Sequence, residues 1–203
     1  MLWIPIYILT GFVAFWAVVI LFLISVYNRL VKLGSNCENA FAQIEVQLKR
    51  RYDLIPNLVE CVKRYMIHER DTLERVIAAR NQAVAGLDQA AKQTGDSEAL
   101  RKWMGAEGTL MGAMSRLSIA MENYPDLKAN ASVADLTEQL TSTENRIAYA
   151  RQAYNDWVTG FNTYRETFPG CLLAGLFGFR QNRSFVEFAD REKLAEAPRV
   201  VMA

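Results

Sequence analysis

The stretch Val46–Glu60, VQLKRRYDLIPNLVE, places three consecutive cations, an acid and a proline inside an otherwise unbroken helical repeat. On both sides of it, apolar or small residues recur at alternating steps of three and four from Leu30 to Tyr65. This heptad-like spacing is typical of a helix that buries one face along its whole length. The pattern predicts a long stalk helix that ends at about Met66.

Pro56 conflicts with this repeat, because a proline inside a helix removes a backbone hydrogen bond and bends or breaks the helix. Asp53 lies three residues earlier and could cap a new first turn. In that turn, Pro56 would lack only a donor that has no partner within the helix. We therefore expect a kink at Pro56 and Asn57 or a restart of the helix at Tyr52 to Asp53.

The chain begins with an apolar stretch, since no charged side chain occurs from Leu2 to Tyr27. A helix of this length exceeds the roughly 30 Å thickness of the hydrocarbon layer. Trp3 and Tyr27 suit the two interfaces. The alternative is a cleaved secretory signal, which would require a basic start and a shorter apolar run. The sequence predicts a single membrane span over residues 1–27.

The cations that flank this span indicate its orientation. Arg29 and Lys32 follow the span, and no Lys or Arg precedes it. Because positive charge is concentrated on the cytoplasmic side of membrane proteins, we expect a single-pass protein of the cell inner membrane with its C-terminal domain in the cytoplasm. A periplasmic domain is the alternative.

Three more helices follow the stalk. The second is expected from about His68 to the loop at 93–97, the third from there to Pro125, and the fourth from Leu136 to Phe168 after a polar turn at 130–135. No segment alternates with period two. The sequence predicts an all-α protein in which the transmembrane helix continues into a long antiparallel four-helix bundle over residues 28–188, followed by a loosely ordered tail over 189–203.

An apolar segment at 168–179 follows the fourth helix and is too short to cross a bilayer. In an antiparallel bundle the fourth helix returns toward the membrane, so we expect this segment to contact lipid headgroups or the stalk of a neighbouring protomer. A cap packed over the end of its own bundle is equally compatible with the sequence. The predicted contact residues are Phe168, Leu172, Leu173, Leu176, Phe177 and Phe179.

Composition argues against several classes of function. A net charge of +1 is unlike the basic surplus of nucleic-acid-binding domains. Three widely spaced cysteines and a single histidine predict neither a disulfide framework nor a zinc site. The chain has no Glu-x-x-His pair, nucleophile elbow or phosphate-binding glycine loop, so we expect no enzyme activity and no cofactor.

Charged residues on or beside the apolar faces predict a polar network between helices, because a buried charge must be paired. We expect Asp53, Glu69 or Glu144 to neutralise Arg51 and Arg80. The residues assigned to this network are Arg51, Asp53, Glu69, Arg80, Glu144, Asn145, Arg146 and Arg151.

The run Gln47–Val59, together with Val62-Lys63 and His68-Glu69, resembles the signature of the bacterial LemA family. The same resemblance extends to Tyr124-Pro125-Asp126-Leu127, Glu144-Asn145-Arg146-Ile147-Ala148, Ala150-Arg151, Tyr154-Asn155 and Phe168-Pro169. It implies a single-span membrane protein with an antiparallel helical bundle and no established catalytic activity. One member of the family is associated with magnetosome membrane formation, which implies a role in organising membranes.

These observations together predict a non-catalytic, membrane-anchored helical scaffold that self-associates and organises membrane or membrane-protein partners. Its expected partners are membrane lipid, further copies of the chain and an unidentified membrane protein, but no nucleic acid. Glycines 105, 108 and 112 in the third helix would allow a neighbouring helix to approach closely. The alternative is an adaptor or regulatory subunit of a membrane protease or signalling system.

Overall fold

A computed structural model describes residues 3–92, 97–128 and 130–187. Every regular element in these ranges is helical, which confirms the predicted all-α class. The elements are α1 (Trp3–Lys63), the short 3-10 turn η1 (Ile67–Glu69), α2 (Arg70–Lys92), α3 (Ser97–Met121), α4 (Pro125–Lys128), α5 (Ala131–Glu166) and α6 (Gly170–Leu173). The tail predicted over 189–203 lies outside the described residues.

The chain divides into two compact units, and each is described by itself. The first unit comprises residues 1–39 and 156–183, and the second comprises residues 40–155 and 184–203. Helices α1 and α5 each contribute residues to both units.

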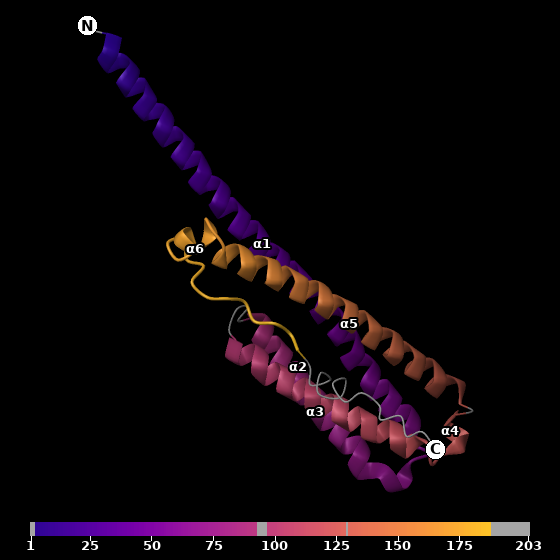
Figure 1. Ribbon diagram of the computed structural model, residues 1–203. Helices are drawn as coiled ribbons and strands as arrows, with labels where there is room; N and C mark the ends of the chain where they lie inside the picture. Colours follow the sequence, from indigo (N-terminus) through magenta and orange to yellow (C-terminus); the bar gives the residue numbers. More distant parts are fainter. Residues whose placement is uncertain (1–2, 93–96, 129, 188–203) are drawn as a thin grey trace, which may run out of the picture. The chain divides into compact units, whose positions relative to one another are not determined.

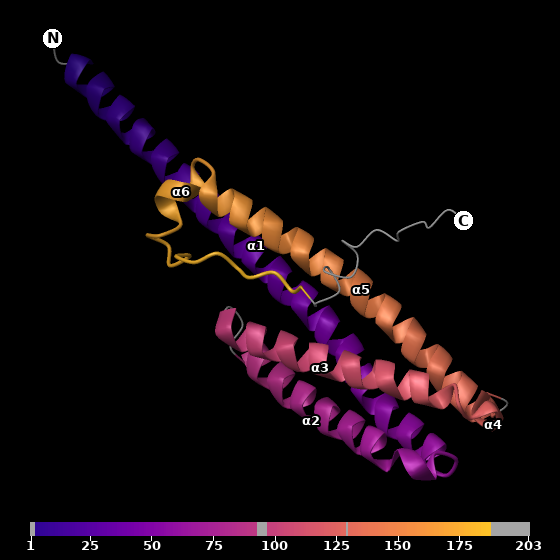
Figure 2. The same ribbon diagram turned by 60° about the horizontal axis from the view of Figure 1, so that its bottom comes forward.

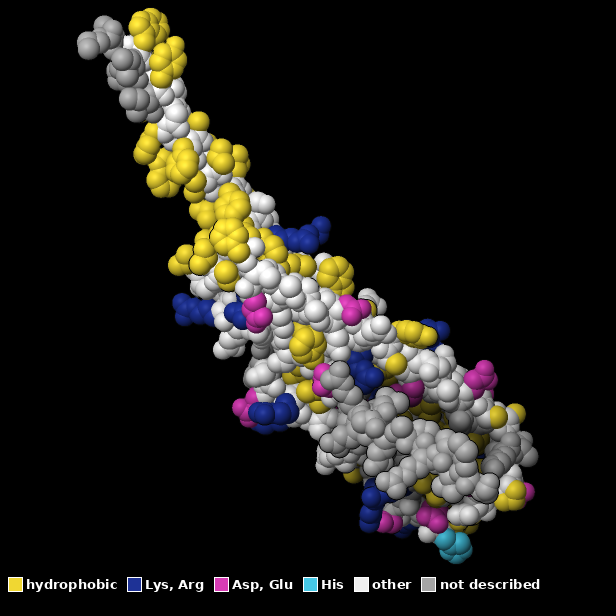
Figure 3. Space-filling model, in the orientation of Figure 1, with side chains coloured by type: hydrophobic (Ala, Val, Ile, Leu, Met, Phe, Trp, Pro, Cys, Tyr) yellow, Lys and Arg dark blue, Asp and Glu magenta, His cyan; other side chains and the backbone are white. Residues whose placement is uncertain are grey.

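In the first unit, the N-terminal half of α1 presents apolar side chains outward (Figure 3). Leu9, Phe12 and Leu21 are each at least 60% exposed. Within the part of the chain that the structure describes, α1 is the one helix long and apolar enough to cross a membrane, and 6% of its most apolar stretch is buried. A membrane is the environment that would cover these side chains.

Further along in the same unit, the C-terminal turns of α5 pack against α1, and both views draw the two helices side by side (Figures 1 and 2). Leu30, Cys37 and Phe161 are buried in this contact region. Gly34 also faces this contact, and a Cβ there would lie in ordinary van der Waals contact with the Phe161 ring, at 3.9 Å. In this unit, α5 of the same chain therefore buries the apolar side chains that recur along α1.

In the second unit, four helical segments pack together: the rest of α1, α2, α3 and the first part of α5. Helices α2 and α3 form an antiparallel pair (Figures 1 and 2). They approach closely at Gly86, where a Cβ would lie 3.2 Å from the Cα of Trp103. The Phe41 ring makes edge contacts with Trp103 and Tyr154, whose ring centroids lie 6.0 and 5.7 Å away. These aromatic rings join α1, α3 and α5 in one core.

The restart of the stalk helix expected at Tyr52 to Asp53 is wrong, because α1 continues without interruption from Trp3 to Lys63 with Pro56 and Asn57 inside it. Pro56 has no N–H to donate to the carbonyl of Tyr52, four residues earlier. The Nε of Arg80 on α2 donates to that carbonyl instead, at 3.0 Å. A side chain from a neighbouring helix thus replaces the missing backbone donor.

The prediction of a polar turn over 130–135 is also wrong for residues 131–135, because α5 begins at Ala131. The Asn130 side-chain oxygen accepts hydrogen bonds from the backbone N–H groups of Ser132 and Val133, at 3.0 and 3.3 Å. Asparagine in this position satisfies the free donors of the first turn and so starts the helix.

Candidate functional site

A buried arginine occupies the centre of the second unit and joins three helices. Arg51 on α1 donates from one terminal nitrogen to Glu107 on α3, and from the other to Glu144 on α5 at 2.7 Å. The Tyr52 hydroxyl donates to the second oxygen of Glu107. We call Arg51, Tyr52, Glu107 and Glu144 the arginine cluster.

The members of the cluster differ in exposure. Arg51 is 3% exposed, Tyr52 is 2% exposed and Glu107 is fully buried, whereas the Glu144 side chain is 45% exposed. Taking Arg51 and Glu107 out of water is costly, and their mutual attraction and hydrogen bonds offset this cost only while both are present. The buried Arg51–Glu107 contact therefore fixes how α1 and α3 are rotated against one another.

Electrostatics hold these groups in fixed protonation states. Burial lowers the pKa of Arg51, but the carboxylates of Glu107 and Glu144 outweigh this effect and raise its pKa above the ordinary value. Burial and the negative charge of Glu107 raise the pKa of Tyr52. Arg51 stays charged and Tyr52 stays neutral near pH 7, so both act as hydrogen-bond donors to Glu107.

Arg80 connects α2 to the same region. In addition to its bond to the Tyr52 carbonyl, its Nη1 lies 3.1 Å from the Asn81 side-chain oxygen, and its Nη2 lies 3.9 Å from the carboxylate of Asp53. The Asp53 side chain is 80% exposed, so this ion pair is weak. The main contact of Arg80 is with the carbonyl that Pro56 leaves without a helical donor.

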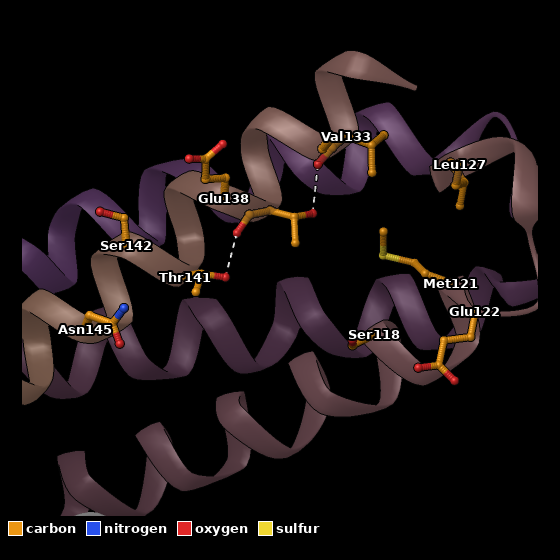
Figure 4. Close-up of a pocket in the computed structure, with 11 residues that line it drawn as sticks. Ser118, Met121, Glu122, Leu127, Val133, Glu138, Thr141, Ser142 and Asn145 are labelled. Carbon is orange, nitrogen blue, oxygen red and sulfur yellow. Dashed lines mark hydrogen bonds between the residues drawn. The ribbon is translucent and has the colours of Figure 1, made fainter. Parts of the chain in front are cut away.

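A groove runs between α3 and α5 beside the cluster. Its first part is a pocket of about 750 Å³ at the end of α3 and the start of α5, where Met121, Leu127, Val133 and Asn145 are among the lining side chains (Figure 4). Its second part, about 340 Å³, reaches Arg51 and Glu144 and is otherwise lined mainly by apolar side chains. The two parts share Ser118, Met121, Thr137 and Thr141.

The hydroxyl groups of this groove are largely occupied. Thr137 donates to the carbonyl of Val133 at 2.8 Å, and Thr141 donates to the carbonyl of Thr137 at 2.9 Å (Figure 4). Both bonds stay within α5, as is common for threonine in a helix. Among the described residues, no group of three His, Cys, Asp or Glu side chains is placed to hold a metal ion.

In the first unit, the structure places the apolar segment 168–179, which we call the tip segment, beside α1. The Phe177 ring contacts Tyr27 at a centroid distance of 5.3 Å, and the Phe179 ring contacts Phe161 at 6.0 Å. Leu173 and both of these phenylalanines are partly buried. Phe168, Leu172 and Leu176 are 76%, 65% and 80% exposed.

Gly170 allows the chain to turn back at the start of the tip segment. A Cβ at this position would lie 2.0 Å from the carbonyl oxygen of Tyr164, so only glycine fits. Beyond the tip, Asn162 holds the returning chain through two bonds of 2.9 Å with the backbone of Arg183, and the Arg183 guanidinium pairs with Glu38 at 2.9 Å. The tip segment is thus fastened to its own unit at both ends.

The LemA family model matches residues 40–201 of this sequence, which is most of the chain. The chain belongs to the LemA family. The matched range contains the arginine cluster, the α3–α5 groove and the tip segment, and it begins after the apolar half of α1.

Among its relatives, this LemA-family chain is 26% identical over 176 residues to "Magnetosome protein MamQ 2" of Paramagnetospirillum magneticum (strain ATCC 700264 / AMB-1). It is 25% identical over 176 residues to "Magnetosome protein MamQ" of Magnetospirillum gryphiswaldense (strain DSM 6361 / JCM 21280 / NBRC 15271 / MSR-1). Each match covers 79% of this chain and 65% of the relative. The LemA family and the MamQ relatives support a membrane-associated protein.

The structure brings together only part of the predicted polar network. Arg51 meets Glu144, and Arg80 lies near Asp53. The other assigned residues lie elsewhere: Glu69 accepts a hydrogen bond from Thr72 at 3.3 Å, Asn145 lines the groove, Arg146 is exposed and Arg151 is partly buried on α5.

Sequence reasoning missed Glu107 as the principal partner of Arg51. Its signal was present, because Glu107 is the polar exception in the apolar series of the third helix. Asn155 was named only as part of the family resemblance, and its contact was missed; its amide makes two hydrogen bonds with the backbone of Val186, at 3.0 and 3.1 Å. Asparagine is common on helix surfaces, so spacing alone gave no reason to single it out.

Proposed function

We propose that the protein is a non-catalytic, membrane-anchored helical scaffold that self-associates and organises membrane or membrane-protein partners. The observation that carries this proposal is the composition of α1. Its N-terminal half exposes apolar side chains, and its C-terminal half supplies Arg51 and Tyr52 to the core of the second unit. One helix therefore supplies both the membrane attachment and the centre of the helical core.

The contacts of the arginine cluster support a structural role for its charges. The Arg51 guanidinium is bound by two carboxylates, and the Tyr52 hydroxyl is bound by one of them. Groups that are buried and held by one another in this way specify the packing of helices. The MamQ relatives are named as magnetosome proteins, which favours a role at a membrane.

Self-association is supported by three glycines of α3, of which Gly105 and Gly112 are exposed and Gly108 is partly buried. A Cβ added at Gly105, Gly108 or Gly112 would meet no atom within 4 Å. Each glycine lowers helix propensity by about 1 kcal/mol relative to alanine, and packing within the described chain does not require its small size. We propose that this face receives a helix of a second copy, whose effective concentration is raised by attachment to the same membrane.

The proposed location is the cell inner membrane with the second unit in the cytoplasm, since Arg29 and Lys32 follow the apolar stretch. In a Cys61→Ala, Cys171→Ser background, Ser142→Cys provides an exposed reporter on α5. In spheroplasts, a membrane-impermeant maleimide should leave this cysteine unlabelled until the cells are lysed. Labelling of intact spheroplasts would place the unit in the periplasm.

The decisive experiment for the scaffold is cross-linking in native membranes, followed by affinity purification of the full chain and measurement of the mass of each assembly. The expected product is mainly an oligomer of this chain, with a mass that is a fixed multiple of the mass of one chain. Recovery of a different protein in fixed stoichiometry would support the adaptor or regulatory-subunit alternative. A monodisperse monomer both in membranes and in mild detergent would contradict self-association.

A further inference from the structure

We infer that the tip segment, residues 168–179, inserts its exposed apolar side chains into the lipid interface beside the span of α1. The chain would then touch the membrane at two places that are far apart in sequence. This inference rests on the membrane anchoring proposed above and adds lipid as the partner of a specific surface.

The level of the tip along α1 is set by an aromatic contact inside the first unit. Phe177 packs edge-on against Tyr27 at 5.3 Å, and Tyr27 lies two residues before Arg29, the first charged side chain of the chain. Tyrosine at the end of an apolar span lies at the boundary between hydrocarbon and headgroups. The tip is therefore held at the depth of that boundary.

Three apolar residues of the tip are exposed, and we call the surface that they form the apolar face of the tip. Phe168, Leu172 and Leu176 follow one another at steps of four, and all three are at least 65% exposed. No charged residue occurs from 168 to 179, so this face has the composition of an interfacial membrane contact.

Cations lie around this apolar face. Arg29 and Lys32 follow Tyr27 on α1, Arg180 directly follows the tip, and all three are exposed. Cations next to an inserted apolar face attract anionic lipid headgroups. The face is continuous with the apolar half of α1, which makes lipid a better occupant than a second copy of the chain.

Packing within the first unit orients this face outward. Phe177 and Phe179 are held by Tyr27 and Phe161, and Gly170 fixes the turn that begins the tip. The anchored phenylalanines leave Phe168, Leu172 and Leu176 with no comparable cover from the described chain. Insertion would remove these side chains from water without rearrangement of the tip.

Cys171 provides a native reporter, because it is exposed within the tip while Cys37 is buried. We would replace Cys61 and Cys37 by alanine, attach a nitroxide to Cys171 of the full chain, and reconstitute it in nanodiscs of zwitterionic and anionic phospholipid. Collisions with oxygen report on lipid exposure, and collisions with a water-soluble nickel chelate report on water exposure. In a Cys171→Ser background, Val13→Cys and Ser142→Cys supply reference sites for lipid and water.

The expected result is an oxygen-to-nickel collision ratio at Cys171, and at single cysteines placed at 172 and 176, that lies clearly above the ratio at site 142 and below the ratio at site 13, because the tip is placed at the boundary of the hydrocarbon layer. The paired substitution Leu172→Glu and Leu176→Glu should shift Cys171 toward the ratio at site 142. Both leucines are exposed, so helix content should stay unchanged. Thr163→Glu, on an exposed site of α5, is the matched control and should leave the ratio at Cys171 as it was.

Two results would overturn the inference. A ratio at 171, 172 and 176 equal to that at site 142 would place the tip in water. Labels protected from both reagents and close to labels on another chain would assign the face to a second copy. Water exposure at site 13 itself would instead contradict the membrane anchoring, so failure of the anchoring and failure of the inference are distinguishable.

Discussion

Arg51 is a guanidinium removed from water in the middle of a helix, and it is tolerated because two carboxylates on other helices face it. The two carboxylates are not equivalent. Glu107 is fully buried and is also bound by Tyr52, whereas the Glu144 side chain is 45% exposed. At the scale of the residue, the Arg51–Glu107 pair should therefore dominate the response to substitution, and Glu144 should contribute less.

Arg51→Met should lower the free energy of unfolding of the second unit by about 3–5 kcal/mol, because Glu107 would remain buried without a cation. Denaturant titration of the full chain in mild detergent would measure this loss. Arg50→Met is the matched control, since Arg50 is an exposed neighbour of the same type, and it should change stability by no more than about 0.5 kcal/mol.

Glu107→Gln combined with Arg51→Met removes both charges of the buried pair. This double variant should be more stable than Arg51→Met alone, because no uncompensated buried charge remains. Equal stability of the two variants would show that Glu107 does not depend on Arg51.

Tyr52 makes the stability of the fold sensitive to alkaline pH. Burial and the Glu107 carboxylate raise the pKa of its phenol in the folded state, while the unfolded phenol ionises at about pH 10. Above about pH 10 the unfolded chain loses this proton and the folded chain keeps it, which favours unfolding. The contribution of the protonated Tyr52 phenol to the free energy of unfolding is therefore complete below about pH 10 and decreases as the pH rises further.

Tyr52→Phe should flatten this alkaline decrease in unfolding free energy, and it should cost about 1–3 kcal/mol at neutral pH because Glu107 loses a donor. Tyr149→Phe, at a site 75% exposed, is the control and should retain the slope of the parent protein. If the unfolding free energies of Tyr52→Phe and of the parent protein decrease with the same slope between about pH 9 and pH 11, Tyr52 is not the group responsible for the alkaline decrease.

At the scale of the element, α1 shows how a helix can contain a proline without a break. Pro56 removes the donor for the Tyr52 carbonyl, and Arg80 on α2 supplies another. The continuity of α1 at this point therefore depends on its packing partner as well as on its own sequence.

Arg80→Leu should destabilise the second unit by about 1–3 kcal/mol, because the Tyr52 carbonyl would lose its donor. In a Pro56→Ala background the new backbone N–H can bond to that carbonyl, so the same Arg80→Leu change should cost clearly less. A double-mutant cycle measured by denaturant titration gives this coupling. Arg75→Leu, at an exposed position of α2, is the control; equal costs of Arg80→Leu in both backgrounds would rule out the replacement role.

At the scale of the whole molecule, glycines serve two different purposes: packing within the helical core and the proposed self-association. Gly86 lies against Trp103, where a Cβ would be 3.2 Å from backbone, and so it serves packing within the chain. Gly108 and Gly112 lie where a Cβ would meet nothing, and we assign them to contact with a second copy.

Gly108→Ala with Gly112→Ala should therefore stabilise the isolated chain by up to about 1 kcal/mol per site and at the same time weaken its self-association. Mass measurement in nanodiscs, combined with denaturant titration, separates the two effects. Gly86→Ala is the contrasting variant and should bring no gain in stability. If Gly108→Ala with Gly112→Ala stabilises the chain and leaves the assembly mass unchanged, the glycine face is not the interface.

The sequence by itself determined the helical class, the apolar span and most helix boundaries, because these depend on periodicity and on the distribution of charge along the chain. It also marked Arg51 and Arg80 as charged residues on or beside apolar faces. It did not pair Arg51 with Glu107, since that contact requires the relative rotation of two helices whose contact residues are 56 positions apart.

Only the tertiary structure decided how the local conflicts were resolved. A kink or a restart of the helix was expected near Pro56, because Arg80 is 24 positions away in sequence and reaches the Tyr52 carbonyl only when α2 packs on α1. The tip segment read equally as an end cap or as a contact surface. In the structure the segment does both. The rings of Phe177 and Phe179 pack against the helices, whereas Phe168, Leu172 and Leu176 are exposed. Hydrophobicity along the chain cannot distinguish these residues, whereas their contacts and exposure in the folded chain do.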